Sequence, residues 1–204
     1  MEIIAILLFA FAVSLDGFGA GVAYGLREIK IPLKSLLIIS LASTFAISLS
    51  MFSGQFIASL FSVTWAERLG SVILISMGFW IIMQALAVNK SSDDKKVIKI
   101  NIKMLGIVIQ VMREPAKADF DSSGVISSRE ACVLGFALAM DALGAGFGAA
   151  MTGFTPYLTP IIVGIFKFVL LTAGLWLGGK SSGNWLGAKA GVLPGVVLIL
   201  LGIM

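Results

Sequence analysis

Long apolar runs, separated by short polar connections, dominate this 204-residue sequence. Six of them fall at residues 3–25, 36–60, 69–88, 131–151, 158–178 and 185–204. As a helix, each run is long enough to cross the ~30 Å hydrocarbon layer of a bilayer. The apolar residues are continuous and do not alternate with polar ones, which favours helices over the strands of a membrane barrel. We therefore predict an all-α membrane protein with six transmembrane helices.

The second half of the chain repeats a pattern of the first half. The sequence Phe-Ala-x-x-x-Asp-x-x-Gly-Ala-Gly occurs at residues 11–21 and again at residues 136–146. Because each half contains three predicted spans, an odd number, the second copy must enter the membrane the opposite way up. We predict two inverted three-helix repeats, residues 1–89 and 131–204, with a linker at 90–118 and a loop at 119–130 between them.

Asp16 and Asp141 are the only acidic residues inside the predicted spans. A carboxylate at the bilayer centre costs ~2.5–3.5 kcal/mol on insertion scales, so two at matched positions indicate a functional pair. Two ionised carboxylates at that depth would repel, so one should hold a proton or both should share a cation. The alternative is a pair of neutral, hydrogen-bonded acids that only holds helices together.

Lys167 is the one basic residue within the predicted spans, too far from either end of its span to reach water easily. We expect it to pair with Asp16 or Asp141. Its ammonium would be either a fixed counter-ion or an internal cation that is displaced when substrate binds. A purely structural role, in which the lysine neutralises one aspartate, is the alternative.

Glycines recur at intervals of four residues in several predicted spans. They are Gly17, Gly21 and Gly25; Gly144 and Gly148; Gly174 and Gly178; and Gly187, Gly191 and Gly195. In lipid this spacing lets helix backbones approach closely, so most of these residues are expected to pack helices. Near the aspartates, the missing side chains of Gly19, Gly21, Gly144 and Gly146 would expose backbone carbonyls to an ion. We include Gly19 and Gly144 among the candidate ion-binding residues, with helix packing as the alternative.

The second predicted span is rich in hydroxyl groups. They belong to Ser40, Ser43, Thr44, Ser48, Ser50 and Ser53. Such a density of polar side chains would line an aqueous path, or it would form hydrogen bonds between helices. The sequence leaves both interpretations open.

Composition agrees with a membrane protein, because 58% of residues are hydrophobic, 13% are charged and the mean hydropathy is +1.03. The chain has no His and a single Cys, so neither a disulfide framework nor a His or Cys metal cluster is available. Any bound metal must use oxygen ligands. No nucleophile motif indicates an enzyme, and no basic stripe with interleaved aromatic residues indicates nucleic-acid binding.

Nearly all of the 15 Lys and Arg residues fall in connections on one side of the predicted bundle. The richest is the connection between the third and fourth spans. Positive charge marks the cytoplasmic side of a membrane protein, so we predict that both termini face outward and that this long connection is cytoplasmic. The net charge of +4 therefore reports orientation at the lipid surface.

Residues 119–130 match the twelve-residue calcium loop of an EF-hand. The predicted ligands are Asp119, Asp121, Ser123, Val125 through its carbonyl, Ser127 and Glu130. Gly124 is at the sixth position, where the loop turns sharply. Ser127 and Glu130 would also form a capping box at the start of the fourth span, which is the alternative explanation for those two residues.

These motifs resemble the manganese efflux pump family (MntP), and more closely its branch of sporulation membrane proteins called YtaF. The resemblance rests on the motifs around Asp16 and Asp141, on the six-span layout and on the loop that contains Asp121. It implies a divalent-cation exporter in which the two aspartates bind Mn²⁺, and for the YtaF branch a link to spore formation. Three features depart from the manganese pumps, namely the absence of an acid in Ile38–Phe56, the presence of Lys167, and the calcium-type loop.

We therefore predict a membrane transporter that exports a divalent cation, Mn²⁺ or Ca²⁺, through Asp16 and Asp141 and is regulated by cytosolic metal at the loop. The alternative is a sporulation scaffold or signalling protein that transports nothing and senses metal through the loop. The expected partners are the lipid bilayer and a divalent cation, and the sequence leaves the oligomeric state open.

Overall fold

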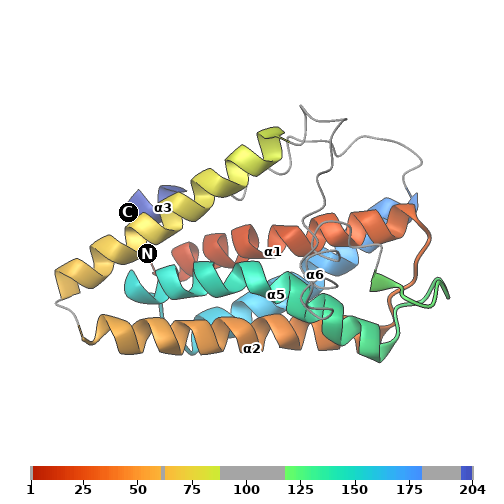
Figure 1. Ribbon diagram of the computed structural model, residues 1–204, viewed down its shortest axis with the longest axis horizontal. Coiled ribbons are helices and arrows are strands. Elements are labelled where there is room, and N and C mark those ends of the chain that lie inside the picture. The colour runs from red at the N-terminus through yellow and green to blue at the C-terminus, as the bar shows by residue number, and fades with distance from the viewer. Residues whose placement is uncertain (1, 61–62, 88–117, 181–198, 204) are drawn as a thin grey trace, which may run out of the picture.

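A computed structural model of the protein describes residues 2–60, 63–87, 118–180 and 199–203 (Figure 1). Its long helices are α1 (Glu2–Leu26), α2 (Leu33–Ala58), α3 (Val63–Ala87), α5 (Ser128–Met151) and α6 (Leu158–Lys180). The predicted linker at 90–118, apart from its last residue, and most of the sixth predicted span lie outside the described residues.

Helices α1, α2, α3 and α6 are each long and apolar enough to cross a membrane. Helix α5 is a fifth candidate span if its two parts, Ser128–Met140 and Ala142–Met151, count as one bent helix. The described residues thus confirm an all-helical protein with four or five candidate membrane spans. Helix α3 begins earlier than the apolar run at 69–88 predicts, because the exposed Glu67 and Arg68 are included in its first turns, where they can reach the water interface.

Helix α1 packs along α6, and helix α2 packs along α5, and these are the two most extensive helix contacts in the described residues (Figure 1). Glycines make the first contact close. A Cβ atom placed on Gly25 of α1 would lie 2.5 Å from the carbonyl oxygen of Leu175 and 2.6 Å from the amide nitrogen of Gly179 on α6. The helix backbones therefore touch, as the spacing of glycines predicts.

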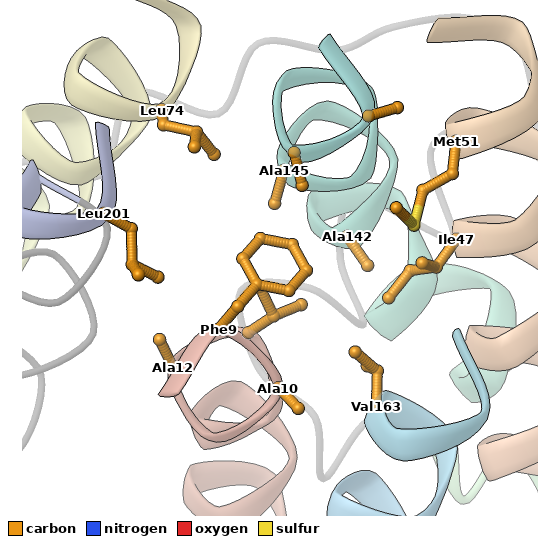
Figure 2. Close-up of a cluster of buried hydrophobic side chains, with 13 residues drawn as sticks. Phe9, Ala10, Ala12, Ile47, Met51, Leu74, Ala142, Ala145, Val163 and Leu201 are labelled. Atoms are coloured by element: carbon orange, nitrogen blue, oxygen red, sulfur yellow. The ribbon is translucent and has the colours of Figure 1, made fainter. Parts of the chain in front are cut away.

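Phe9 of α1 lies in the middle of one buried hydrophobic cluster (Figure 2). Around it are Ile47 and Met51 of α2, Leu74 of α3, Ala142 and Ala145 of α5, Val163 of α6, and Leu201. A Cβ atom on Gly202 would lie 2.8 Å from Ile75, so residues 199–203 pack directly on α3. The end of the chain therefore returns to the helix bundle.

A second buried cluster joins the carboxyl end of α1 to the loop before α5. Tyr24 of α1, Leu36 of α2 and Leu134 of α5 meet there with Ile126 of the loop, and all four are buried. The loop is therefore anchored by apolar contacts to three of the long helices.

Candidate functional site

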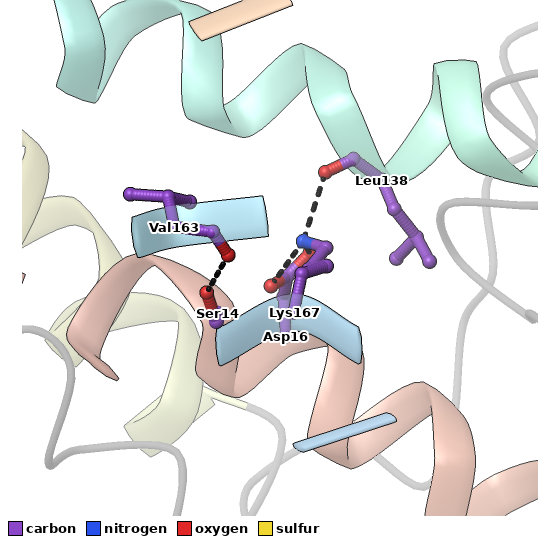
Figure 3. Close-up of polar contacts among 5 residues, drawn as sticks. All are labelled: Ser14, Asp16, Leu138, Val163 and Lys167. Atoms are coloured by element: carbon purple, nitrogen blue, oxygen red, sulfur yellow. Dashed lines mark hydrogen bonds and ion pairs between the residues drawn. The ribbon is translucent and has the colours of Figure 1, made fainter. Parts of the chain in front are cut away.

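Asp16 of α1 and Lys167 of α6 form an ion pair in the interior of the bundle (Figure 3). The Lys167 Nζ atom donates to Asp16 Oδ1 at 2.6 Å, to Asp16 Oδ2 at 2.5 Å, and to the carbonyl oxygen of Leu138 on α5 at 3.2 Å. An ammonium group has three protons, so this group is fully hydrogen-bonded. The lysine side chain is 1% exposed and the aspartate 25%.

The local sequence of α1 gives the lysine room to reach across the helix. A Cβ atom on Gly17 would lie 3.0 Å from Lys167 Cδ, so the missing side chain of this glycine accommodates the alkyl chain of the lysine. Nearby, Ser14 Oγ donates to the carbonyl oxygen of Val163 at 3.3 Å and ties α1 to α6 a second time (Figure 3). Ser14 was not among the candidates that the sequence indicated, because a serine on an apolar helix has no distinguishing signal.

Helix α5 bends by 43° at Asp141, between Ser128–Met140 and Ala142–Met151. Carbonyl groups on both sides of the bend accept hydrogen bonds from neighbouring helices. The carbonyl of Leu138 accepts from Lys167, and that of Leu143 accepts from Ser50 of α2. A side chain that competes for helix carbonyls is an established cause of bending, and no proline is needed.

Asp141 itself is placed by its backbone, three residues after Leu138 in α5. Its side chain lies outside the described part of the structure. The expectation that Lys167 pairs with an aspartate therefore holds for Asp16. A site shared by both aspartates stays a prediction.

The two candidate glycines differ in their surroundings. Gly19 is exposed, and a Cβ atom there would meet nothing within 4 Å. A Cβ atom on Gly144 would lie 2.9 Å from Met77 Sδ, so this residue packs α5 against α3. Neither observation tests whether the backbone carbonyls near these residues bind an ion.

The hydroxyl groups of α2 mostly bond within their own helix. Ser40, Thr44, Ser48 and Ser53 each donate to the carbonyl oxygen four residues earlier, and Ser50 donates to Leu143 of α5. The oxygen of Ser43 is buried and has no hydrogen-bond partner in the described part of the chain. For most of these residues the structure therefore favours hydrogen bonding within and between helices over an aqueous path.

The predicted calcium loop gathers three carboxylates. Oxygen atoms of Asp119, Asp121 and Glu130 all lie within 4.8 Å of one another. Glu130 Oε1 accepts from the amide of Phe120 at 2.7 Å and Oε2 from the amide of Ser127 at 2.8 Å, and the capping box of Ser127 and Glu130 is present. Each carboxylate oxygen has a further lone pair, so these bonds leave the oxygens able to bind a cation.

The loop conformation depends on its glycine and its serine. Gly124 has φ of 74°, a left-handed conformation that glycine adopts without strain. Hydrogen bonds from the side chain of Ser123, and to a lesser degree from its amide, hold the pKa of the Asp121 carboxyl below its usual range. Asp121 therefore stays ionised at neutral pH, as a metal ligand must.

The loop is bonded to the connection between α1 and α2. The amide of Lys30 donates to the carbonyl of Gly124 at 2.8 Å, and the amide of Ile126 donates to the carbonyl of Lys30 at 2.9 Å. Ser35 Oγ, in the first turn of α2, donates to the carbonyl of Ile126 at 2.7 Å. The loop thus connects the end of α1 and the start of α2 with the start of α5, which leads to Asp141.

Comparison with known proteins identifies relatives along the whole chain. Residues 1–82 and 96–204 match the family described as "Putative manganese efflux pump" (MntP). The chain is 41% identical to the "Probable sporulation protein YtaF" of Bacillus subtilis (strain 168), with 100% of this chain and 99% of the relative covered. It is 26% identical to a "Putative manganese efflux pump MntP" of Clostridium perfringens (strain 13 / Type A), with 100% and 93% covered. No solved structure matches significantly. The resemblance seen in the aspartate motifs is confirmed, and the chain belongs to the MntP family.

Proposed function

We propose that this protein is a membrane transporter that exports a divalent cation, Mn²⁺ or Ca²⁺, through a site built around Asp16 and Asp141. The observation that carries the proposal is the binding of a cationic group, the Lys167 ammonium, by two carboxylate oxygens and one carbonyl oxygen inside the bundle. Oxygen-only coordination suits hard divalent ions. The matching family and one of the relatives are described as "Putative manganese efflux pump", which supports a cation as the substrate.

The helix contacts support two inverted repeats. If α5 is the counterpart of α1 and α6 is the counterpart of α2, the α1–α6 contact corresponds to the α5–α2 contact. These two contacts are the most extensive ones among the helices that the structure describes. Contacts between single residues also agree with this correspondence of helices. A Cβ atom on Gly21 would lie 2.9 Å from Leu175, and one on Gly146 would lie 3.4 Å from Ser50. Gly146 follows Gly21, and Leu175 follows Ser50, by the same number of residues that separates Asp16 from Asp141. A sixth span at residues 185–204, most of which lie outside the described residues, would complete this arrangement.

The two halves of the repeat differ at one charged position. The counterpart of Lys167 in the first half is Ala42 of α2, so the repeat supplies no second lysine for Asp141. When Asp16, Asp141 and Lys167 are all ionised, the set has one net negative charge. A divalent cation would leave one positive charge in the hydrocarbon, which is costly. We therefore propose that one positive charge, the displaced proton of Lys167, leaves the site as the divalent cation enters.

Loss of transport in two aspartate variants tests the proposal. In proteoliposomes, Asp16→Asn and Asp141→Asn should each lower the rate of Mn²⁺ uptake by at least about tenfold, because each removes a charged ligand while keeping the size of the side chain. Glu67→Gln is the matched control, since it changes an exposed acid at the start of α3. Uptake is compared at equal amounts of folded, reconstituted protein.

The control variant should transport as the wild-type protein does. If both aspartate variants also transport Mn²⁺ and Ca²⁺ at the wild-type rate, the site is not formed by these residues. If the wild-type protein moves neither ion, the transport proposal itself is wrong.

We further propose that the loop binds Ca²⁺ in the cytoplasm, with both termini of the chain outside. Asp119, Asp121 and Glu130 would supply carboxylate oxygens, Ser123 and Ser127 hydroxyl oxygens, directly or through water, and Val125 a carbonyl oxygen. The close approach of the three carboxylates supports this proposal. Binding would fix the start of α5 relative to α1 and α2, through the bonds of the loop to Lys30 and Ser35. This is a physical route by which cytosolic metal would regulate the site.

A thermal-stability assay in vesicles of both orientations tests whether the loop binds Ca²⁺ and on which side of the membrane it lies. In inside-out vesicles, Ca²⁺ should raise the temperature at which the protein loses solubility, because a bound ion stabilises the folded loop. Right-side-out vesicles should show no such shift, and Asp121→Asn should abolish it. Asp121 is exposed, so its substitution leaves the packing intact. A shift in right-side-out vesicles alone would reverse the orientation, and no shift in either would reduce the loop to a helix cap.

A second function follows from the similarity to YtaF of Bacillus subtilis, whose name associates that protein with sporulation. In this alternative the protein is a membrane scaffold or signalling component of spore formation, and the loop senses metal. Docking of the loop against three helices favours it, since metal binding would then change the cytoplasmic face of the bundle. A calcium response of the loop without any cation transport by the wild-type protein would support this alternative.

A further inference from the structure

Ser43 of α2 has a buried hydroxyl group that bonds to nothing in the described part of the protein. The residue is 0% exposed, and its Oγ atom has no hydrogen-bond partner. Leaving a buried polar group unpaired costs ~1–3 kcal/mol, so such a group in a folded protein needs an explanation. One such explanation is that the hydroxyl oxygen binds an ion.

The geometry of serine on a helix does not account for this state. A serine can donate to the carbonyl oxygen four residues earlier, and the hydroxyl groups of Ser40, Thr44, Ser48 and Ser53 on the same helix all do so. Ser43 could form the same hydrogen bond, but its hydroxyl does not. Its hydroxyl is therefore free to interact with something other than α2.

The contacts on both sides of Ser43 place it beside the bend of α5. A Cβ atom on Gly135 would lie 3.0 Å from Ala42, and one on Gly146 would lie 3.5 Å from Ile47. Ser43 lies four residues before Ile47, so it is on the side of α2 that packs against the part of α5 between Gly135 and Gly146. That part contains Leu138, whose carbonyl binds Lys167, and the bend at Asp141.

Helix α6 also packs against α2 close to Ser43. A Cβ atom on Gly164 would lie 3.3 Å from Thr44 Cβ and 3.7 Å from the carbonyl oxygen of Ser40. Lys167 follows Gly164 by less than one turn of α6. Ser43 therefore lies in the part of α2 that packs against both the bent segment of α5 and the segment of α6 that leads to Lys167.

We propose that the hydroxyl oxygen of Ser43 is a ligand of the transported divalent cation, on the side of the site that Asp141 forms. This inference rests on the proposed function. A neutral hydroxyl suits the position, because hard cations accept neutral oxygen ligands beside carboxylates and an added acid would increase the repulsion between charges. Ser43 thus sets the affinity for the ion, while the aspartates provide the charge.

The test is Ser43→Ala, which removes the oxygen and keeps the fold. In proteoliposomes, the Mn²⁺ concentration that gives half-maximal uptake should rise about tenfold, with little change in the maximal rate, as expected when one oxygen ligand is lost. Without metal, the variant should unfold at the same temperature as the wild-type protein or a higher one, because an unpaired buried hydroxyl has been removed. Ser43→Thr, which keeps the oxygen, should restore the affinity.

Thr159 provides a matched control. Its hydroxyl is also buried without a partner in the described residues, but it lies in the first turn of α6, away from the ion pair. Thr159→Val should therefore change stability in the same direction as Ser43→Ala and leave the Mn²⁺ dependence of uptake unchanged.

Three outcomes separate the possibilities. A shift in Mn²⁺ dependence for Ser43→Ala, with none for Thr159→Val, supports the ligand role. Wild-type Mn²⁺ dependence in Ser43→Ala, in an assay where Asp141→Asn loses uptake, overturns the role of Ser43 and leaves the proposed function standing. Unchanged uptake in Asp141→Asn overturns the proposed function, and the Ser43 inference with it.

Discussion

Asp16→Ala is expected to lower the free energy of unfolding by ~3–5 kcal/mol, the usual cost of removing one partner of a buried ion pair. The substitution leaves the Lys167 ammonium, which is 1% exposed, with only the carbonyl of Leu138 as a partner. An uncompensated ammonium inside the bundle is far more costly than the few contacts that the aspartate side chain makes. The measurement is thermal unfolding of the purified protein in detergent.

The double variant Asp16→Ala with Lys167→Met distinguishes loss of pairing from loss of packing. It removes both charges and keeps an apolar chain of similar length over Gly17, so most of the lost stability should return. Cation uptake should not return, because the proposed carboxylate ligand, Asp16, is still absent. A double variant that is no more stable than Asp16→Ala would show that the ion pair has little influence on the fold.

The sequence predicted that Lys167 pairs with an aspartate, but it did not identify which one. The reason is that both candidates lie at the same depth, and depth is what a hydrophobic pattern measures. The choice of Asp16 depends on the register of α1 against α6. That register is set by contacts of Gly21 and Gly25 with α6, between residues far apart in the chain. The glycine spacing indicated close packing, but a spacing alone does not name the partner helix.

The bend of α5 had no signal in the sequence. Residues Ser128–Met151 contain no proline, and a single apolar run at 131–151 predicts one straight span. The bend arises beside hydrogen bonds that Lys167 and Ser50 donate to carbonyls of α5, and both donors come from other helices. Interactions of this kind depend on the tertiary structure, so a pattern within one helix cannot predict them.

The loop shows how a local motif and its surroundings differ in predictability. The approach of Asp119, Asp121 and Glu130 was expected, because an EF-hand motif fixes its ligands within twelve consecutive residues. The bonds of the loop to Lys30 were not expected. They join segments separated by most of the first repeat and the linker, and the connection that contains Lys30 is polar and carries no pairing motif.

Gly174→Ala is expected to destabilise the bundle severely, although it adds only one methyl group. The new Cβ atom would meet the carbonyl oxygen of Phe18 and would lie 3.0 Å from the amide nitrogen of Val22, both on the backbone of α1. Backbone atoms of a helix cannot rotate away as side chains do, so α1 and α6 must separate. Overpacking typically costs ~1–3 kcal/mol, and this contact should reach the upper end or exceed it.

Gly19→Ala is the matched control, since a Cβ atom there meets nothing within 4 Å. Replacing a glycine within a helix by alanine gains ~0.5–1 kcal/mol in helix propensity, so this variant should be at least as stable as the wild-type protein. Thermal unfolding of both variants measures the difference. Cation uptake should fall in Gly174→Ala as well, because the same helix contact holds Lys167 against Asp16. Equal stability of the two variants would mean that α1 and α6 do not touch along their glycines, and that the ion pair is positioned by other contacts.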